Sequence, residues 1–322
     1  MSLDFDDLQE LLWGFASHRV ITVAGRVGIL TRMAQGSATP DELAGALGLD
    51  PLATGKVVRA LTALGLLESA GGGAYQMVAT LTPHFIPGPE AWTPFLEHSH
   101  ALYDRWAASL EPWLRGEPWT TQPRGREGTR VFGAAMQAMG AQVARMAAEH
   151  IDLAGVRRLL DVGGGFGQYA RALCARKPDI EPTVLDRPEV VDLAREALAG
   201  TEWEGRIAFI GGDYHEADYG DGYDLVLNAN ILHQEPAERA AAIIRRSAAA
   251  LAPGGRVVVL DFAIDDERHA PLLGTLFAVN MRSLGDTHTS PAITGWMEAS
   301  GLARVERLDF NRHRWLIIGH RE

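Results

Sequence analysis

The stretch Leu159-Leu160-Asp161-Val162-Gly163-Gly164-Gly165-Phe166-Gly167 decides the fold of this chain. It joins an apolar strand to a following helix through a glycine-rich turn, and Asp161 stands near the end of the strand. Glycine permits the sharp turn and lets a ligand approach the backbone N–H groups at the partially positive start of the helix. The stretch therefore predicts a ligand-binding loop between a strand and a helix.

The spacing of the glycines separates two classes of ligand. A dinucleotide loop has the pattern G-x-G-x-x-G, and counted from Gly163 the third glycine falls on Gln168. Asp161 also puts negative charge where a pyrophosphate would lie, whereas such a carboxylate suits an ammonium group. S-adenosylmethionine has no phosphate and is cationic, so it fits better than NAD. A tight glycine turn without a ligand stays open as the alternative.

Acidic residues follow the next two predicted strands. The strand 182–185 leads into Asp186, at the distance where an acid reaches ribose hydroxyls in nucleoside-binding α/β folds. A third strand, 207–210, leads into Asp213 and Tyr214, where a carboxylate can accept from an adenine amine and an aromatic ring can lie on the base. Either acid alone is typical of an ordinary turn. Their order after successive strands favours an adenosyl site.

Strands and helices alternate after residue 150. The expected elements are strands at 158–162, 182–185, 207–210, 223–228 and 255–262 with helices at 167–176, 188–199 and 236–251, closed by an antiparallel pair at 303–308 and 314–319. Such alternation predicts a mainly parallel sheet with helices on both faces, in which ligands bind beyond the carboxyl ends of the strands. That edge should gather the polar residues that follow or end these strands, namely Asp161, Asp186, Asp213, His233 and Asp261.

The first part of the chain has a helical pattern. Apolar residues recur at helical spacing over 5–34. Thr39 and Pro40 begin a short helix, a second helix is expected through Leu67, and a hairpin is expected at 71–77. A helix-turn-helix with such a wing is typical of DNA-binding regulators. Residues 1–100 nevertheless carry ten acidic and only five basic residues, which favours dimerisation over duplex binding.

His233 is the candidate for chemistry. It lies a few residues beyond the strand 223–228, within Asn230-Ile231-Leu232-His233-Gln234. Methyl transfer to a phenol needs the acceptor aligned and relieved of its proton, which a positioned imidazole can do as general base. A histidine that only caps the helix start near Pro236 is an equally open interpretation of position alone.

Composition narrows the class of protein further. With 322 residues, 47% of them hydrophobic, the chain can form two domains. Its net charge of −11 argues against a broad surface for nucleic acid or anionic membrane. The lone Cys174 argues against a disulfide framework, and no signal segment or long apolar span is found, so a cytoplasmic location is expected. We expect a small-molecule substrate and no metal.

Over nearly its whole length the chain resembles the class I S-adenosylmethionine-dependent O-methyltransferases of the plant caffeic-acid and bacterial small-molecule types. The matching pieces are Asp161 to Gly167, Val184 to Pro188, Gly211 to Asp213, Ile231 to His233 and Ala252 to Arg256. The resemblance implies an α/β fold, a Rossmann-like mainly parallel sheet with an N-terminal all-helical winged-helix dimerisation domain. It divides the chain into that domain at 1–100, linking helices at 101–150 that contribute to a substrate pocket, and a cofactor-binding catalytic domain at 151–322.

The resemblance also implies roles for single residues. His233 matches the general base, and Asp261 matches an acid that steers the histidine. The residues expected to bind S-adenosylmethionine are Asp161, Gly163 and Gly165 at its methionine part, Asp186 at its ribose, Asp213 and Tyr214 at its adenine, and also Arg187 and Asn228. The residues expected in the acceptor pocket are Met136, Met139 and His288.

Two positions depart from the family pattern. Gln234 stands where the family commonly has Asp, and Thr287 stands where it commonly has Glu. We expect O-methylation of a small aromatic or polycyclic molecule by a homodimer formed through the N-terminal domain. Three alternatives stay open, namely C-methylation of a tetrapyrrole or 2-oxo acid, a cofactor held without methyl transfer, and a ligand-sensing winged-helix regulator.

Overall fold

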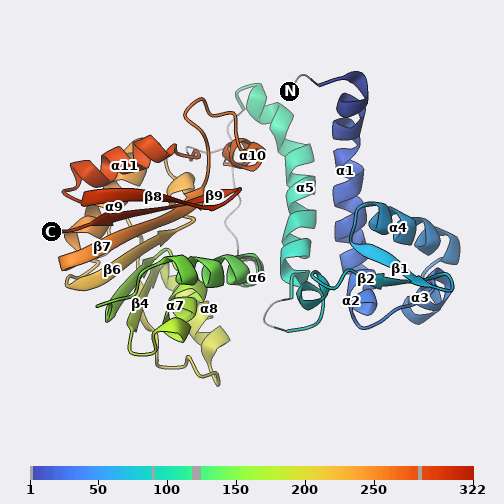
Figure 1. Ribbon diagram of the computed structural model, residues 1–322, viewed down its shortest axis with the longest axis horizontal. Helices are drawn as coiled ribbons and strands as arrows, with labels where there is room; N and C mark the ends of the chain where they lie inside the picture. Colours follow the sequence, from blue (N-terminus) through green and yellow to red (C-terminus); the bar gives the residue numbers. More distant parts are fainter. Residues whose placement is uncertain (1–2, 89–90, 118–124, 282–284) are drawn as a thin grey trace. The chain divides into compact units, whose positions relative to one another are not determined.

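The computed structural model describes residues 3–88, 91–117, 125–281 and 285–322 (Figure 1). The chain divides into two compact units, one formed by residues 1–108 and 134–139 and the other by residues 109–133 and 140–322. Each unit has its own hydrophobic core. The division into 1–100, 101–150 and 151–322 stays a prediction.

The first unit contains a winged helix. Its elements in chain order are α1 (Phe5–Arg26), α2 (Ile29–Ala34), α3 (Pro40–Leu47), α4 (Pro51–Ala63), β1 (Leu67–Gly71), β2 (Ala74–Met77), η1 (Thr82–His84) and most of α5 (Thr93–Leu114). Thr39 accepts from the backbone N–H of Glu42, and the Glu42 side chain accepts from the backbone of Thr39 in return. The expected helix pair and hairpin are present, but α4 ends before Leu67 because Gly65 turns the chain at a φ of 77°.

The core of the first unit forms where these helices meet the hairpin. It includes Leu30, Met33, Leu43, Val58 and Leu61, each at most 1% exposed. Apart from its last turns, α1 contributes few buried side chains, and several of its large apolar residues are exposed. This helix therefore carries more apolar surface than the core of its own unit covers.

The second unit is a seven-stranded sheet with helices on both faces. Its elements are α6 (Arg126–His150), β3 (Arg158–Val162), α7 (Gln168–Arg176), β4 (Glu181–Asp186), α8 (Pro188–Leu198), β5 (Ala208–Gly211), β6 (Tyr223–Ala229), η2 (Leu232–Gln234), α9 (Ala237–Ala249), β7 (Leu251–Phe262), α10 (Leu272–Asn280), α11 (Ser290–Ala299), β8 (Ala303–Asn311) and β9 (Arg314–His320). The strand order is β5-β4-β3-β6-β7-β9-β8. The first five strands are parallel, and β9 pairs antiparallel with both of its neighbours.

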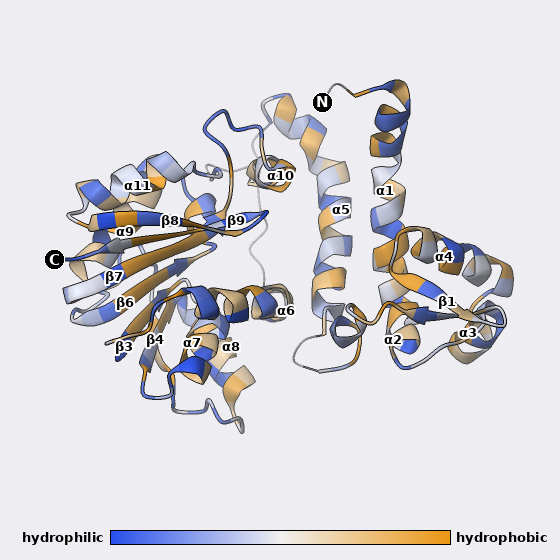
Figure 2. Ribbon diagram, in the orientation of Figure 1, coloured by the Kyte–Doolittle hydropathy of each residue, from blue (hydrophilic) through white to orange (hydrophobic). Residues whose placement is uncertain are grey.

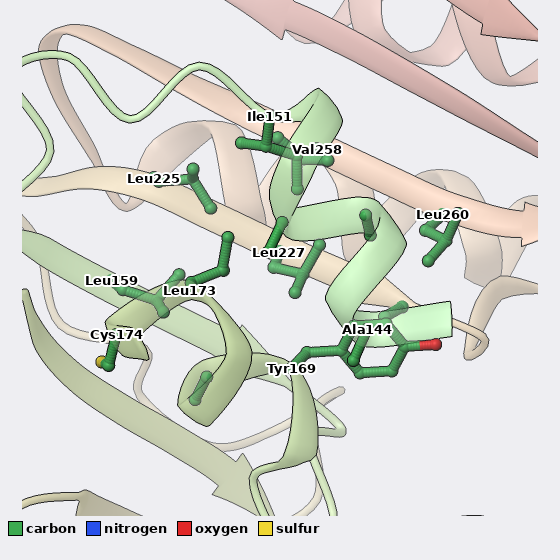
Figure 3. Packing of buried hydrophobic residues seen from close by; sticks show 14 of the residues in the cluster. Ala144, Ile151, Leu159, Tyr169, Leu173, Cys174, Leu225, Leu227, Val258 and Leu260 are labelled. Atoms are coloured by element: carbon green, nitrogen blue, oxygen red, sulfur yellow. The ribbon is translucent and has the colours of Figure 1, made fainter. Parts of the chain in front are cut away.

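The two faces of this sheet bury separate clusters of apolar side chains. Figure 3 shows part of one cluster, in which Tyr169 and Leu173 of α7 and Ala144 of α6 pack with Leu225 and Leu227 of β6. The other cluster joins α9 and α11 to the opposite face. Figure 2 shows the buried strands β6 and β7 in hydrophobic colours. The strands that end at the site are therefore packed on both faces of the sheet.

The expected α/β alternation is confirmed with small shifts at the ends of elements. The helix expected at 236–251 ends at Ala249, because Leu251 already pairs with Tyr223 in the sheet. The segment Ala252 to Gly255 is an irregular part of β7 in which Gly254 has a φ of 76°. Among the residues that the structure describes, none of the helices combines the length and apolar character needed to cross a membrane.

Candidate functional site

The carboxyl ends of the parallel strands bring the expected polar residues to one edge of the second unit. Register pairs Val162 with Leu185 on one side and with Asn228 on the other, so β3, β4 and β6 end close together. The chain reverses its direction of travel across the sheet between β3 and β6, because β4 lies on one side of β3 and β6 on the other. Ligands of open α/β sheets bind at such a switch point.

The glycine loop after β3 is shaped by close contacts. Gly163 has a φ of 66°, and a Cβ at this position would lie 2.6 Å from Cγ2 of Ile231. A Cβ on Gly164 would lie 2.6 Å from Cγ of Asp161. The N–H of Gly165 donates to Oδ2 of Asp186 at 2.8 Å, which ties the loop to the end of β4. The loop thus needs glycine because the backbone passes directly over its neighbours.

Asp161 is a fully buried carboxylate at the base of this loop. Among the described residues, neither of its oxygens accepts a well-formed hydrogen bond. Burial raises the pKa of Asp161 to about 8; the nearby backbone N–H of Ala170 offsets part of the shift, and repulsion from Asp186 adds to it. A buried anion without well-formed hydrogen bonds is costly, so the site is suited to a cationic group. Its chemistry fits the ammonium end of an amino-acid-containing cofactor.

Asp186 and Arg187 stand at the end of β4. Oδ1 of Asp186 accepts from the N–H of Arg187 at 2.8 Å. Burial raises the pKa of Asp186, and these backbone hydrogen bonds offset part of that effect. A carboxylate offers about four lone-pair sites, so capacity to accept from hydroxyl groups remains. The Arg187 guanidinium pairs with Glu189 at 3.3 Å on the surface.

Asp213 and Tyr214 follow β5. Oδ1 of Asp213 accepts from the N–H of His215, and the Tyr214 hydroxyl donates to Oε1 of Glu235 at 2.8 Å. Burial and the negative charge of Glu235 together raise the pKa of Tyr214. Because Glu235 directly follows η2, this hydrogen bond links the loop after β5 to the segment that carries His233.

His233 and Asp261 form the buried pair at the centre of the edge. Nδ1 of His233 lies 2.6 Å from Oδ1 of Asp261, and the backbone N–H of His233 donates to Oδ2 at 3.2 Å. Desolvation favours the protonated form of Asp261, but the attraction and hydrogen bonds of His233 and the Phe262 N–H hold its pKa below the usual value. The ionised carboxylate therefore accepts a hydrogen bond from Nδ1–H of the neutral imidazole, which leaves the lone pair of Nε2 available.

Aromatic rings surround the imidazole. Phe262 and Phe277 contact the His233 ring edge-on at centroid distances of 5.2 and 4.9 Å, and they stack on each other at 3.8 Å. The Phe277 ring comes from α10 and the Phe262 ring from the end of β7. Sequence gave no indication of Phe277, whereas Phe262 could have been suspected from its place beside Asp261.

Four expected site residues lie in other surroundings. Asn228 is fully buried, and its amide oxygen accepts from Ser247 of α9 at 3.1 Å. His288 is 5% exposed, and its Nε2 donates to backbone carbonyl groups. Met136 and Met139 are half-buried on α6, in the segment that belongs to the first unit. These contacts do not support a cofactor role for Asn228 or a pocket role for His288, and all four assignments stay predictions.

Asn230 is a residue at this edge that the sequence did not single out. It has a φ of 55°, which is uncommon for a residue other than glycine. Its Nδ2 donates to the Tyr169 hydroxyl at 2.7 Å, and its Oδ1 accepts from Nε of Arg314 at 3.2 Å. Burial raises the pKa of Tyr169 to about 12. These bonds fix the chain where it leaves β6, three residues before His233.

The described part of the chain contains no group of three or more His, Cys, Asp or Glu side chains placed to hold a metal ion. Nδ1 of His233 faces Asp261, and Nε2 of His288 faces backbone carbonyl groups.

Comparisons with known proteins agree on one family. A family model described as an O-methyltransferase domain matches residues 111–298. The 3-hydroxy-5-methyl-1-naphthoate 3-O-methyltransferase of Streptomyces sahachiroi is 29% identical over 94% of this chain and 91% of its own length. The tetracenomycin polyketide synthesis 8-O-methyl transferase TcmO of Streptomyces glaucescens is 27% identical over 98% of this chain and 96% of its own length.

A solved structure agrees with these relatives. The S-adenosylmethionine-dependent methyltransferase SibL in its apo form is 26% identical, covers 99% of both chains and has a TM-score of 0.79.

Proposed function

This chain belongs to the O-methyltransferase domain family and uses S-adenosylmethionine, and from that premise we propose that it methylates a hydroxyl group of a small aromatic or polycyclic molecule with His233 as general base. The main support for the proposal is the 2.6 Å contact between Nδ1 of His233 and Oδ1 of Asp261. This contact lies at the same edge of the sheet as the glycine loop. Nδ1 is thereby occupied, so the proton of the acceptor hydroxyl passes to Nε2.

The residues of the glycine loop and the following strand ends fit the cofactor. When bound, S-adenosylmethionine supplies a methyl group on a positively charged sulfur, which is an electrophile. Asp161 would hold its ammonium group, Asp186 its ribose, and Asp213 with the Tyr214 ring its adenine. The fully buried carboxylate of Asp161 supports this assignment, since a cation would compensate its charge.

An aromatic acceptor is supported by the surroundings of His233. The half-buried Phe277 ring, stacked on the buried Phe262, offers an apolar, planar surface beside the imidazole. On the same helix as Phe277, Leu273 and Leu276 are exposed. The relative from S. sahachiroi carries a hydroxynaphthoate in its name, and we propose a hydroxylated arene of comparable size here.

Thr287 does not supply the second acid that the family commonly has. Thr287 is 1% exposed, and its hydroxyl donates to the carbonyl oxygen of Gly274 at 2.9 Å. Among the described residues, Asp261 is the carboxylate that contacts His233 and would stabilise its protonated form.

We also propose that the protein is a cytoplasmic homodimer assembled through its N-terminal unit. The support is the exposed apolar surface of α1, where Leu12 is 68% and Trp13 is 61% exposed. Contiguous apolar surface of this kind marks an interaction site in most proteins.

The test is an assay of purified protein with S-adenosylmethionine and a panel of hydroxylated arenes, hydroxynaphthoates among them. We expect S-adenosylhomocysteine and a methyl ether, identified by mass spectrometry and NMR. A product methylated on carbon would instead support the C-methylation alternative. Tight cofactor binding without transfer to any acceptor of the panel would contradict the proposed acceptor class.

A further inference from the structure

The segment Gly285–Thr289 lies against the backbone of η2, the short turn that carries His233. A Cβ on Gly285 would lie 2.5 Å from the carbonyl oxygen of His233 and 2.7 Å from that of Gln234. The two stretches of backbone are therefore in direct contact, although about fifty residues separate them in the chain. Only glycine fits at this position without displacing the turn.

His288 adds two hydrogen bonds to this contact. Its Nε2 lies 3.1 Å from the carbonyl oxygen of Leu232 and 3.0 Å from that of Glu235. These two carbonyl groups stand on either side of His233 and Gln234. Burial lowers the pKa of His288, with the nearby carboxylates and carbonyl groups offsetting part of the effect. A neutral imidazole must carry its proton on Nε2 to donate here.

The same segment is fixed to other parts of the second unit. Thr287 donates to Gly274 of α10, the helix that brings Phe277 to His233. Arg268 pairs with Asp286. The His288 ring meets Trp296 of α11 edge-on, at a centroid distance of 4.9 Å. His288 is thus held rigidly and can impose its position on the turn.

We propose that His288 is a positioning residue for methyl transfer: it fixes the turn Leu232–Gln234 so that Nε2 of His233 faces the acceptor hydroxyl. The inference rests on the proposed role of His233 as general base. His288 itself touches neither acceptor nor cofactor in this proposal. Asp261 orients the His233 ring through its side chain, and His288 orients the backbone from which the ring projects.

The substitutions His288→Gln and His288→Leu form a matched pair. The amide nitrogen of Gln can take the place of Nε2 and donate to the same carbonyl groups, whereas Leu fills a similar volume without a donor. We expect His288→Leu to lower kcat by roughly 10- to 100-fold, since displacement of a reacting group by about 1 Å has effects of this size. We expect His288→Gln to restore most of the activity, with the affinity for S-adenosylhomocysteine changed by less than about threefold in both variants.

A double-mutant cycle separates positioning from general destabilisation. If His288 acts through His233, the variant His233→Ala with His288→Leu should have the same kcat as His233→Ala alone, because no base is left to position. If the fold losses in kcat of the two single variants multiplied in the double variant, the proposal would be overturned. Equal loss in His288→Gln and His288→Leu would also overturn it.

NMR of protein labelled at its histidine nitrogens tests the proposal without any acceptor. We expect wild type and His288→Gln to give one sharp set of His233 resonances with the proton on Nδ1, and His288→Leu to give broadened or shifted ones. Unchanged His233 resonances in His288→Leu would refute the positioning role. Because this measurement needs no turnover, it stays decisive even if the proposed acceptor class is wrong.

Discussion

The imidazole of His233 and the carboxylate of Asp261 are joined twice, once through the ring nitrogen Nδ1 and once through the backbone N–H of His233. Both side chains are 6% exposed. The ring contact sets the tautomer, while the backbone contact sets the position of the residue relative to the end of β7. A single buried acid therefore orients the proposed base and stabilises the charge that it gains.

Replacing His233 by Ala should remove the base while leaving the cofactor loop intact. We expect kcat to fall by roughly 100- to 10,000-fold, the usual contribution of general base catalysis. The affinity for S-adenosylhomocysteine, measured by calorimetry, should change by less than about threefold. Parallel losses in turnover and in cofactor affinity would show that His233 supports the fold instead.

Asp261→Asn keeps the shape of the acid but removes its charge. The amide can donate to Nδ1 and thereby favour the proton on Nε2, which leaves no lone pair for the acceptor. We expect a fall in kcat of about 1,000-fold or more, as for the equivalent change in serine protease triads. Asp265→Asn is the matched control, because Asp265 lies in the loop after β7 and its side chain accepts from the backbone N–H of His269. Comparable activity losses in the two variants would contradict the assigned role of Asp261.

The sequence was sufficient to predict the strands of the second unit and the helices α7, α8 and α9, but not α10 or α11. The relation between His233 and Asp261 was implied by the resemblance to the family. The predicted elements depend on local patterns: the glycine turn after β3, the acids that end strands, and the parallel order that brings strand ends together. Side chains alternate between the two faces of the sheet along β6, so Val226 and Asn228 lie on the same face, the one covered by α9. This alternation alone would have predicted that Asn228 packs against α9.

The surroundings of His233 depend on contacts that no local pattern encodes. The contacts of His288 with η2 and Glu235 span about fifty residues and involve backbone carbonyl groups, which no sequence pattern identifies. Asn230 turns to the opposite face from Asn228 because of its positive φ, and there it meets Tyr169 of α7. Long-range packing decides where such side chains point, so their contacts became clear only from the structure.

The buried carboxylate of Asp161 predicts a pH dependence of stability. Burial raises its pKa from 3.8 to about 8 in the folded chain, so the folded state holds a proton that the unfolded state loses between about pH 4 and about pH 8. Over this range the stability of the cofactor-free protein should fall as pH rises. Asp161→Asn should weaken that dependence, which thermal unfolding at several pH values can measure. If the stability of Asp161→Asn had the same pH dependence as that of wild type, this dependence could not be assigned to Asp161.

Cofactor binding should reverse the effect at Asp161. A cation beside the carboxylate favours its ionised form, so binding below about pH 8 should release a proton. Calorimetry in buffers of different ionisation enthalpy measures this release directly. We expect tighter binding as pH rises toward 8 in wild type and a much smaller change in Asp161→Asn. Binding without proton release would show that the ammonium group does not lie at this carboxylate.

Gly163→Ala should damage the cofactor loop in two ways. Its φ of 66° costs a residue with a Cβ about 1–2 kcal/mol, and the new atom would lie 2.6 Å from Ile231. Gly155→Ala is the control, because Gly155 has a φ of 74° and no atom within 4 Å of its added Cβ. We expect both variants to lose stability in chemical unfolding but only Gly163→Ala to lose cofactor affinity, by roughly tenfold or more. If Gly163→Ala and Gly155→Ala bound the cofactor with equal affinity, the glycine loop would not be part of the cofactor site.

The apolar surface of α1 predicts the oligomeric state. If a second copy covers this helix, Leu12→Glu with Trp13→Glu should convert a dimer into a monomer, because two charges would have to be desolvated in the interface. Light scattering coupled to size-exclusion chromatography measures the mass directly. Leu272→Glu is the matched control: Leu272 is 64% exposed on α10 of the second unit, outside the N-terminal unit proposed to form the interface, so its dimer should persist. A wild-type protein that stays monomeric at micromolar concentration would refute the proposed dimer, and a dimer that survives the double substitution would place its interface elsewhere.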